Sequence, residues 1–236
     1  MTDLTRTLAD HGAVTSRKYE FTGETRQFLG RPLRRIRARS SFGDVTAGDL
    51  GGWIESEGNL AQSGAAWVLG NAQVYGDARV RGNAQVYGAA QVYGAARVYG
   101  DARVYGDARV SGDAWVSGDA WVSGDAQVYG NAWVSGAARV SGAAQVSGAA
   151  RVSCAAHLCH IGPIGSRHAF LTVVRDATLG LRFTTGGFSG SRAEFSSAVS
   201  AKHEEGSIPR IEYDAAIALI DAWSRAHSHE MSMEAS

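Results

Sequence analysis

The stretch Gly64–Ser153 reads GAAWVL GNAQVY GDARVR GNAQVY GAAQVY GAARVY GDARVY GDARVS GDAWVS GDAWVS GDAQVY GNAWVS GAARVS GAAQVS GAARVS. These 90 residues make 15 consecutive hexads without an insertion or a gap. Glycine opens every hexad, alanine fills the third place and valine fills the fifth. A fixed short period of this kind indicates a stacked repeat architecture.

The alternation of side chains along a strand explains the alanine and valine places. Residues two apart point to the same side, so alanine and valine form the inner face of a short strand. Glycine followed by Asp, Asn or Ala supplies a tight bend after each strand. One bend every six residues does not fit hairpins, and so short a strand buries its apolar face only by stacking on copies of itself. The pattern therefore predicts a mainly β fold built as a parallel β-helix.

An aliphatic residue followed four places later by a small one, as in Val74 and Ala78, resembles the hexapeptide-repeat left-handed β-helix family. The family's usual glycine directly after the aliphatic residue is replaced here by Tyr or Ser, with glycine one place later. This departure is more similar to a prophage-associated branch than to the enzyme branch. The resemblance implies a triangular, left-handed prism with three hexads per turn, which often forms a homotrimer.

With three hexads per turn, the array makes five coils, about 24 Å long at roughly 4.8 Å per coil. Outward residues then recur every 18 positions and form columns. The first face carries Trp67, Gln85, Arg103, Trp121 and Arg139, with Tyr87 and Tyr105 in the place after valine. The second face carries Gln73, Gln91, Arg109, Gln127 and Gln145, with Tyr75, Tyr93 and Tyr129. The third face carries Arg79, Arg97, Trp115, Trp133 and Arg151, with Tyr99.

Stacked Trp, Tyr and Arg side chains are typical of binding surfaces, because they combine apolar area with directed hydrogen bonds. We expect the third face to be the main contact, most simply between the subunits of a symmetric trimer. A carbohydrate-binding surface is the alternative, and the glutamine ladder is interpreted as a solvated amide stack. The predicted interface residues are Trp115, Trp133, Arg79, Arg97, Arg151, Trp121, Tyr87 and Tyr105.

Two groups of side chains resemble metal sites in composition, and neither is favoured as one. Carboxylates in the middle of the shaft could hold calcium between coils, but Gly-Asp bend chemistry accounts for them. These carboxylates are Asp101, Asp107, Asp113, Asp119 and Asp125. Weak zinc candidates follow the last full hexad, namely Cys154, His157, Cys159 and His160. Cys154 takes the glycine place and Leu158 the valine place. We therefore interpret this segment as a degenerate terminal hexad whose His157 points outward.

The repeat offers little to catalysis. Acyltransferases of the hexapeptide family, as the resemblance implies, use a histidine base and an inserted loop that shapes a cleft. No histidine lies between Gly64 and Ser153, and a smooth prism provides no pocket for a general base. The histidines lie outside, at positions 11, 157, 160, 168, 203, 227 and 229. We therefore predict a protein that is not an enzyme, with no catalytic residue and no cofactor.

The segments on either side of the repeat read as separate units. We expect a flexible N-terminus (1–17), an N-terminal β cap (18–57), the repeat with degenerate end hexads (58–160), a C-terminal α+β domain (161–230) and a flexible tail (231–236). In the cap, 18–28 and 33–39 read as two strands. Their Arg35, Arg37 and Arg39 are expected to be solvated or salt-bridged, and Trp53 to cover the rung ends of the first coil.

The C-terminal segment is predicted to be a small ββαα domain. Strands 169–175 and 179–184 form a hairpin. Ser191 and Glu194 make a capping box that opens a helix running to about 205. A second helix spans roughly 211–227. Its expected apolar face consists of Ala215, Ala216, Leu219, Ile220 and Trp223.

Charge and cysteine content limit the binding partners and the cellular location that we expect. Lys+Arg and Asp+Glu are both 23, so no general electrostatic attraction to nucleic acid or membrane exists. Two cysteines five residues apart do not make a disulfide framework, and no apolar run of signal-peptide or membrane-span length occurs. We expect a protein of the cytoplasm, that of the host cell if the chain is phage-encoded.

The terminal segments resemble uncharacterised phage and prophage repeat proteins. The similarity lies in Gly48-Asp49-Leu50-Gly51-Gly52-Trp53-Ile54-Glu55, Ile164-Gly165-Ser166-Arg167, Gly187-Phe188-Ser189-Gly190, Glu194-Phe195 and His203. It implies an accessory protein of phage origin and no established catalytic residue. The favoured function is a trimeric scaffold that binds and blocks a host protein or complex, such as an anti-phage defence complex, rather than nucleic acid. The alternatives are a virion component that binds glycans, a sponge for a small nucleotide signal between subunits, and an acyltransferase-like enzyme.

Overall fold

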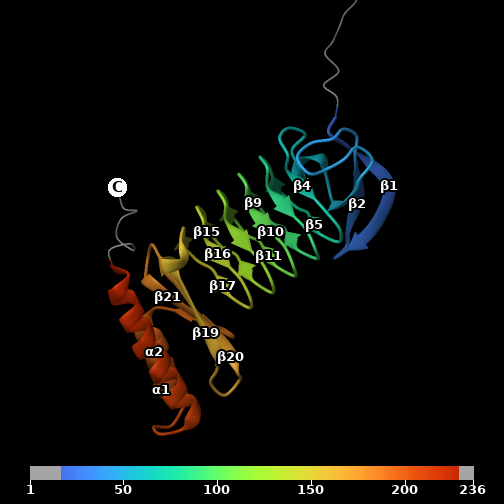
Figure 1. Ribbon diagram of the computed structural model, residues 1–236. Coiled ribbons are helices and arrows are strands. Elements are labelled where there is room, and N and C mark those ends of the chain that lie inside the picture. Colours follow the sequence, from blue (N-terminus) through green and yellow to red (C-terminus); the bar gives the residue numbers. More distant parts are fainter. Residues whose placement is uncertain (1–16, 229–236) are drawn as a thin grey trace, which may run out of the picture.

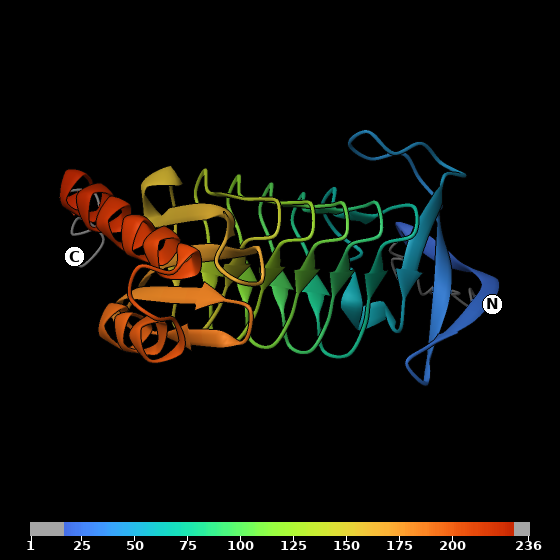
Figure 2. The ribbon, with the colours of Figure 1, turned by 90° about the horizontal axis from the view of Figure 1, so that it is seen from below.

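The computed structural model describes residues 17–228, which form an elongated molecule with three parts in line (Figure 1). A triangular shaft lies in the middle, an N-terminal β region covers one end, and a C-terminal domain with two helices covers the other. Figure 2 shows the same order from below. The predicted mainly β fold with a parallel solenoid is confirmed. The expected flexible tail (231–236) and nearly all of the expected flexible N-terminus lie outside the described residues.

Each hexad of the shaft contributes one strand of two residues, formed by the valine and the residue before it. These strands are β4 (Trp67–Val68), β5 (Gln73–Val74), β6 (Arg79–Val80), β7 (Gln85–Val86), β8 (Gln91–Val92), β9 (Arg97–Val98), β10 (Arg103–Val104), β11 (Arg109–Val110), β12 (Trp115–Val116), β13 (Trp121–Val122), β14 (Gln127–Val128), β15 (Trp133–Val134), β16 (Arg139–Val140), β17 (Gln145–Val146) and β18 (Arg151–Val152). Each pairs in parallel with the strand 18 residues away, as in Arg109↔Gln127. The three predicted columns are therefore correct in every row.

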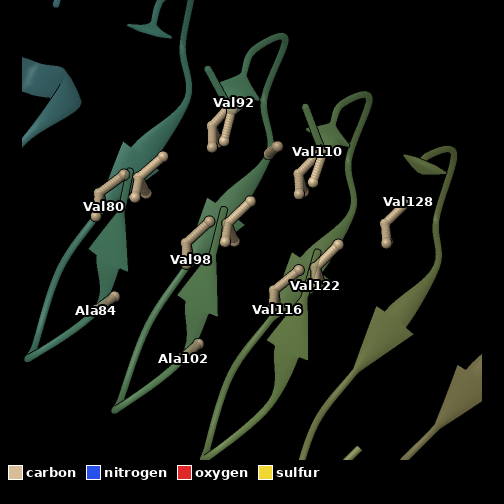
Figure 3. Close-up of a cluster of buried hydrophobic side chains, with 14 of the residues drawn as sticks. Val80, Ala84, Val92, Val98, Ala102, Val110, Val116, Val122 and Val128 are labelled. Carbon is tan, nitrogen blue, oxygen red and sulfur yellow. The ribbon is translucent and has the colours of Figure 1, made fainter. Parts of the chain in front are cut away.

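Between its two ends, the interior of the shaft is filled by the alanines and valines of the hexads. All of these side chains from Ala66 to Ala150 have no exposed surface. Figure 3 shows Val80, Val98 and Val116 lying one above the next. Backbone hydrogen bonds join the coils at both ends of each strand, as when Tyr93 N donates to Val110 O at 2.9 Å. The shaft thus satisfies its backbone between coils while its side chains pack inward.

The glycines let the chain turn where two coils approach most closely. Gly106, for example, has φ +72°, which is the left-handed region that glycine adopts without penalty. A Cβ on Gly106 would lie 2.9 Å from the backbone nitrogen of Gly124 in the next coil. Glycine is therefore required there for two reasons, the turn and the contact.

The N-terminal region continues the shaft with one further rung. Strands β1 (Tyr19–Phe28) and β2 (Arg31–Ala38) form an antiparallel hairpin, and β3 (Leu50–Ile54) pairs with β2 on one side and in parallel with β5 on the other. A short 3₁₀ helix, η1 (Glu57–Asn59), follows. The expected position of Trp53 over the rung ends is wrong. It pairs with Gln73 on the outside, because Gly52-Trp53-Ile54 occupies the Ala-x-Val places and puts Ile54 inside.

The open edge of the first coil is capped by polar side chains. Lys18 Nζ donates to Ala66 O at 2.8 Å, and Tyr19 Oη donates to Leu60 O at 2.9 Å. Asn59 Nδ2 donates to Gly76 O and Ala78 O at 2.8 and 2.9 Å. Burial lowers the pKa of Lys18 to about 8. These contacts satisfy carbonyls that a coil above would otherwise pair.

Two of the three arginines expected to be solvated or salt-bridged in the cap hairpin are in ion pairs, and the third, Arg37, is exposed. Arg35 Nη1 lies 3.1 Å from Glu24 Oε2, and Arg39 Nε lies 3.7 Å from Glu20 Oε2. The acidic partners stand on the neighbouring strand β1. These side chains are largely exposed, so each pair contributes little to stability.

The C-terminal domain is a four-stranded antiparallel sheet with two helices, where two strands were expected. Its strands are β19 (Leu158–Ile164), β20 (Ala169–Asp176), β21 (Gly180–Thr185) and β22 (Phe188–Gly190), in the order β19-β20-β21-β22. A 3₁₀ turn, η2 (Ala155–His157), links it to the shaft. The expected end of the repeat at residue 160 therefore falls inside β19.

The sheet of this domain faces the shaft on one side and the helices on the other. Val174 packs with the shaft core, and Thr172 Oγ1 accepts a hydrogen bond from Gln145 N at 3.0 Å. Leu171 and Val173, which point the opposite way, pack with the helices. Period-2 alternation in β20 thus joins two separate cores through one strand.

The helices are α1 (Arg192–Lys202) and α2 (Ile208–Ala226). The predicted capping box is confirmed, since Ser191 accepts from Glu194 N and the Glu194 carboxylate accepts from Ser191 N. The predicted apolar face of α2 is partly wrong. Leu219 is 56% exposed and Ala215 is also exposed, while the buried residues are Tyr213, Ala216, Ile217 and Ile220. The helix is rotated toward Tyr213 because that ring packs against Phe195 of α1.

A buried ion pair lies where the domain meets the last coil. Asp176 Oδ2 accepts from Arg182 Nε at 2.7 Å, and Asp176 Oδ1 accepts from the backbone of Thr178 and Leu179 at 2.8 and 2.9 Å. The Asp176 carboxylate has no exposed surface. The Arg182 guanidinium lies so close to Gly148 that a Cβ there would be 2.5 Å from it. The pair therefore closes the shaft end and orients the domain.

Candidate functional site

The third face of the shaft carries a continuous ladder of four side chains, Arg97, Trp115, Trp133 and Arg151, which we call the Arg-Trp ladder. The two indole rings are stacked, with centroids 5.1 Å apart and an angle of 11° between their planes. The Arg97 guanidinium lies 4.8 Å from the Trp115 ring, and that of Arg151 lies 4.6 Å from the Trp133 ring. Cations thus flank the aromatic pair at both ends.

The parallel register of the solenoid produces this stacking. Trp115 pairs directly with Trp133, so the same place in consecutive coils holds the same side chain about one strand spacing away. Trp133 is 43% exposed even after stacking, and Trp115 is half-buried. Arg79 extends the column at its upper end, next to Arg97. The predicted members of the third face therefore lie together on one surface.

Arg151 is held in place from behind. Its Nη1 donates to Asn131 O and Ala150 O, both at 3.1 Å, and to Ala149 O at 3.3 Å. These bonds use the carbonyls at the lower end of the column. The guanidinium is thus positioned rigidly under Trp133, which reduces the conformational entropy that a partner would have to remove on binding.

The first face gathers a second aromatic group. Trp121 lies between Arg103 and Arg139, whose guanidinium carbons are 5.3 and 5.0 Å from its ring. Tyr87 and Tyr105 stack at 4.9 Å with nearly parallel rings. Burial, and then the neighbouring Tyr105, raise the pKa of Tyr87, so its hydroxyl remains protonated at neutral pH. The top member of this column, Trp67, is only 4% exposed, so it belongs to the core and not to the surface.

Trp67 is buried because the N-terminal loop folds over it. Its ring meets Tyr19 at 6.3 Å and Phe42 at 5.4 Å. Sequence periodicity placed this tryptophan outward, and the backbone does so, but the loop at 42–50 covers that part of the face. The available aromatic surface of the first face therefore begins at Tyr87.

The second face is mainly polar. Its column holds two glutamines on each side of Arg109, and Tyr75 stacks on Tyr93 at 5.1 Å. Phe28 of the cap covers Tyr75 at 5.7 Å. This face presents fewer exposed aromatic rings than the other two, so it is the weakest candidate for a contact surface.

The segment 154–160 does not gather into a metal centre. His157 is only 1% exposed, so the expectation that it points outward is wrong. Its Nδ1 lies 3.3 Å from Ser153 N, and η2 turns the ring inward instead of continuing the hexad. His160 stacks on Phe170 at 4.8 Å in β19 and β20. Within residues 17–228, no three His, Cys, Asp or Glu side chains are grouped to hold a metal ion.

The carboxylates of the bends stand on the corners of the prism. Asp101 and Asp119 share one corner column, and Asp107 and Asp125 share another. Asn83 Nδ2 donates to Asp101 Oδ1 at 3.0 Å. All of these Asp residues are exposed, which agrees with their interpretation as bend residues.

Sequence reasoning did not anticipate a cavity in the C-terminal domain. Its lining comes from four segments that are distant in the chain. The sequence signal for this cavity lay in the short motifs around Arg167, Gly187 and His203. No repeat pattern indicates that these motifs lie close together in space.

The hexad pattern also appears in known repeats. Six stretches of the shaft match the YdcK β-solenoid repeat, at 72–88, 90–106, 96–111, 102–118, 108–124 and 126–142. The shaft is a hexapeptide-type β-solenoid. A protein of Escherichia coli (strain K12), Uncharacterized acetyltransferase YdcK, is 43% identical over 60 residues. That alignment covers 22% of this chain and only 18% of the YdcK protein.

None of the helices in 17–228 combines the length and the apolar character needed to cross a bilayer.

Proposed function

We propose that this chain is a non-enzymatic accessory protein of a phage or prophage, which forms a homotrimer and blocks a host macromolecule by binding it. The Arg-Trp ladder is the observation that supports a binding role. Trp and Arg dominate the energetics of protein interfaces, and here they are held in a fixed array by a rigid backbone. The phage origin rests on the resemblance of the terminal segments alone. An anti-phage defence complex of the host is the most concrete target.

The size of the shaft limits how a partner can bind. One face is about 24 Å long and about 20 Å wide at six residues per side, which is roughly 480 Å². A stable interface buries about 800 Å² on each partner. A partner therefore has to cover two faces or extend from one face onto a terminal domain. In a threefold ring each subunit meets its two neighbours through two different patches, and the surface outside those patches remains for a host protein.

An acyltransferase is the second candidate, supported by the name of the similar protein. That name describes YdcK, of which the alignment covers 18%. General-base catalysis needs a side chain such as histidine beside a cleft, and residues 64–153 contain no histidine. The hexads also follow one another without an inserted loop. These features favour the binding scaffold.

The test replaces both ladder tryptophans, Trp115→Ser and Trp133→Ser, in the full chain. Light scattering measures the solution mass against the 24.8 kDa of one chain, and capture from host lysate measures partner binding. We expect the double variant to lose the trimer, the captured partner or both, because about two hot-spot residues are removed from the contact.

A matched control is Trp121→Ser, which removes one tryptophan from the first face. If the trimer forms through the ladder, this variant retains the trimer, whereas loss of the captured partner alone would place the host protein on the first face. Unchanged mass and unchanged capture in the Trp115→Ser/Trp133→Ser variant would reject the third face. Acyl transfer by the purified protein from an acyl-coenzyme A donor would reject the non-enzymatic proposal.

A further inference from the structure

The C-terminal domain contains a cavity of about 300 Å³ between the β21–β22 turn and the C-terminal end of α1. Its walls come from the turn at 166–169, the turn at 185–188, helix residues 195–203 and Tyr213 of α2. These are the segments that carry the Ser166-Arg167, Gly187-Phe188 and His203 motifs. The proposed binding scaffold uses none of them, so the cavity requires its own account.

Aromatic rings form the apolar part of the cavity. Phe188 and Phe195 meet at 5.3 Å, and Tyr213 packs edge-on against Phe195 at 5.6 Å. His203 stacks on the Tyr213 ring, with centroids 5.6 Å apart. Phe188 is partly exposed, whereas Phe195 and Tyr213 are only 2% and 8% exposed and form the floor of the cavity. This apolar lining suits a flat apolar group.

The position of Tyr213 is fixed from the opposite side. A Cβ on Gly165 would lie 2.2 Å from the Tyr213 hydroxyl oxygen, so only glycine leaves room for this ring. The Glu212 carboxylate accepts a hydrogen bond from Gly165 N at 2.6 Å. The ring and the strand end are therefore locked together, and the cavity wall is formed in advance of binding.

The polar part of the cavity is basic. Arg167, Lys202 and His203 line it, and no Asp or Glu does. Within residues 17–228, the ion pairs of the chain do not include Arg167 or Lys202, and both side chains are exposed. The end of α1 contributes about half a negative charge, which the two permanent cations outweigh. Burial and Glu212 raise the pKa of Tyr213 whereas Arg167 lowers it, so the guanidinium acts on that hydroxyl.

We infer that this cavity binds a small aromatic molecule that carries an anionic group, a phosphate or a carboxylate. Phe188, Phe195 and Tyr213 contact the ring, while Arg167 and Lys202 bind the anion through charge-assisted hydrogen bonds. A volume of about 300 Å³ is at the lower end for ligand sites, so the ligand has the size of a mononucleotide or an aromatic acid. This site is independent of the Arg-Trp ladder.

The test measures the binding of four small probes to the full chain by ligand-observed NMR titration. Phenyl phosphate carries both the ring and the anion, whereas phenol and inorganic phosphate each carry one of them. We expect phenyl phosphate to bind roughly tenfold or more tightly than either half. Benzoate serves as the carboxylate counterpart, and the tighter of the two binders identifies the anion that the cavity selects.

Two charge-neutralising variants identify the site. Arg167→Gln and Lys202→Gln should each weaken phenyl phosphate binding by about tenfold and leave phenol binding unchanged. Arg81→Gln, which removes an exposed charge from the shaft, is the matched control and should bind as the unmodified protein does. Thermal unfolding confirms that each variant is folded.

Two outcomes overturn the inference. One is the failure of both phenyl phosphate and benzoate to bind at millimolar concentration. The other is equal affinity in Arg167→Gln, Lys202→Gln and Arg81→Gln, which would show attraction to net charge and not to this cavity. Neither result depends on trimer formation or on a host partner, so this test and that of the proposed function can fail separately.

Discussion

The shaft and the C-terminal domain bury apolar side chains in opposite ways. In the shaft, alanines and valines contact copies of themselves one coil away. In the C-terminal domain, residues of four strands and two helices meet in one core that contains Leu171, Phe183, Phe195 and Ile220. The first arrangement depends on nearest neighbours, and the second depends on contacts between distant parts of the chain. A repeated structure provides a regular surface, whereas an irregular one provides a cavity.

The largest expected effect is the loss of stability caused by a charge inside the shaft. Val110→Asp places a carboxylate at a position with no exposed surface and no partner. An uncompensated buried charge costs several kcal/mol, so we expect the coils around it to unfold. Hydrogen exchange measured separately for 64–153 and 169–226 shows whether the C-terminal domain unfolds with the shaft.

Ser111→Asp is the control, because it adds the same charge at the neighbouring position that points outward. It should preserve exchange protection throughout the shaft. Equal protection in Val110→Asp and Ser111→Asp would contradict the packed interior.

The second prediction concerns the junction of the two regions. Asp176→Ala removes the buried partner of Arg182 together with two hydrogen bonds from backbone N–H groups. We expect a loss of about 3 kcal/mol in the free energy of unfolding. Asp214→Ala removes the exposed pair with Arg210 and should change stability by no more than about 0.5 kcal/mol. Chemical denaturation of both variants tests the difference.

The same carboxylate makes the junction sensitive to acid. Burial acts to raise the pKa of Asp176, but the hydrogen bonds from Arg182, Leu179 and Thr178 outweigh it and hold the pKa below its usual value. The unfolded chain therefore takes up this proton at a higher pH than the folded chain. The stabilisation is complete above about pH 5 and is lost as the pH falls through the folded pKa. The difference in Tm between the unmodified protein and Asp176→Ala should shrink below pH 4, and a constant difference would contradict this.

A pair of glycines sharpens the comparison further. Gly106 in the shaft and Gly180 in the C-terminal domain both have φ +72°. A Cβ on Gly106 would meet the next coil at 2.9 Å, whereas nothing lies within 4 Å of a Cβ on Gly180. Gly180→Ala should therefore cost only the conformational penalty, about 1–2 kcal/mol. Gly106→Ala should cost about 2 kcal/mol more, because backbone must move. An equal loss of stability in the two variants, measured by thermal unfolding, would show that the backbone of the next coil moves at no cost.

The smallest expected effect lies on the corners of the shaft. Asp107 and Asp125 stand at the same place in consecutive coils, so their like charges repel. Asp107→Asn should raise Tm by about 1 °C at low salt. The gain should vanish at 1 M salt, where the Debye length is about 3 Å. Asp77→Asn, whose neighbour one coil on is Ala95, is the control and should leave Tm unchanged.

How much could be predicted from the sequence differs between the two regions. The columns of the shaft followed from the places of alanine and valine, because the side-chain period and the 18-residue register leave no freedom. The predicted extent of the repeat was wrong at both ends. Trp53 continues a column because Gly52 and Ile54 imitate Ala and Val. Leu158 imitates Val as well, yet it begins β19 and pairs with Val174.

The candidate sites show the same division. The Arg-Trp ladder was predictable, since its members recur at a fixed interval along one column. The cavity was not, because Arg167, Phe188 and His203 approach one another only after the sheet and helices have packed. The orientation of α2 was missed for a related reason. The pattern of α2 allows either Leu219 or Tyr213 to face inward, and the ring of Phe195 in another helix decides.

The 18-residue register also means that the number of coils sets the distance between the cap and the C-terminal domain. Deleting 18 residues would bring the cap and the C-terminal domain closer by about 4.8 Å without turning one against the other, apart from the small twist of one coil. Deleting six would turn them by a third of a revolution. The separation of the two terminal domains and their relative rotation about the shaft axis therefore change in fixed steps. A molecule that touches both ends at once would recognise the number of coils as strictly as it recognises any side chain.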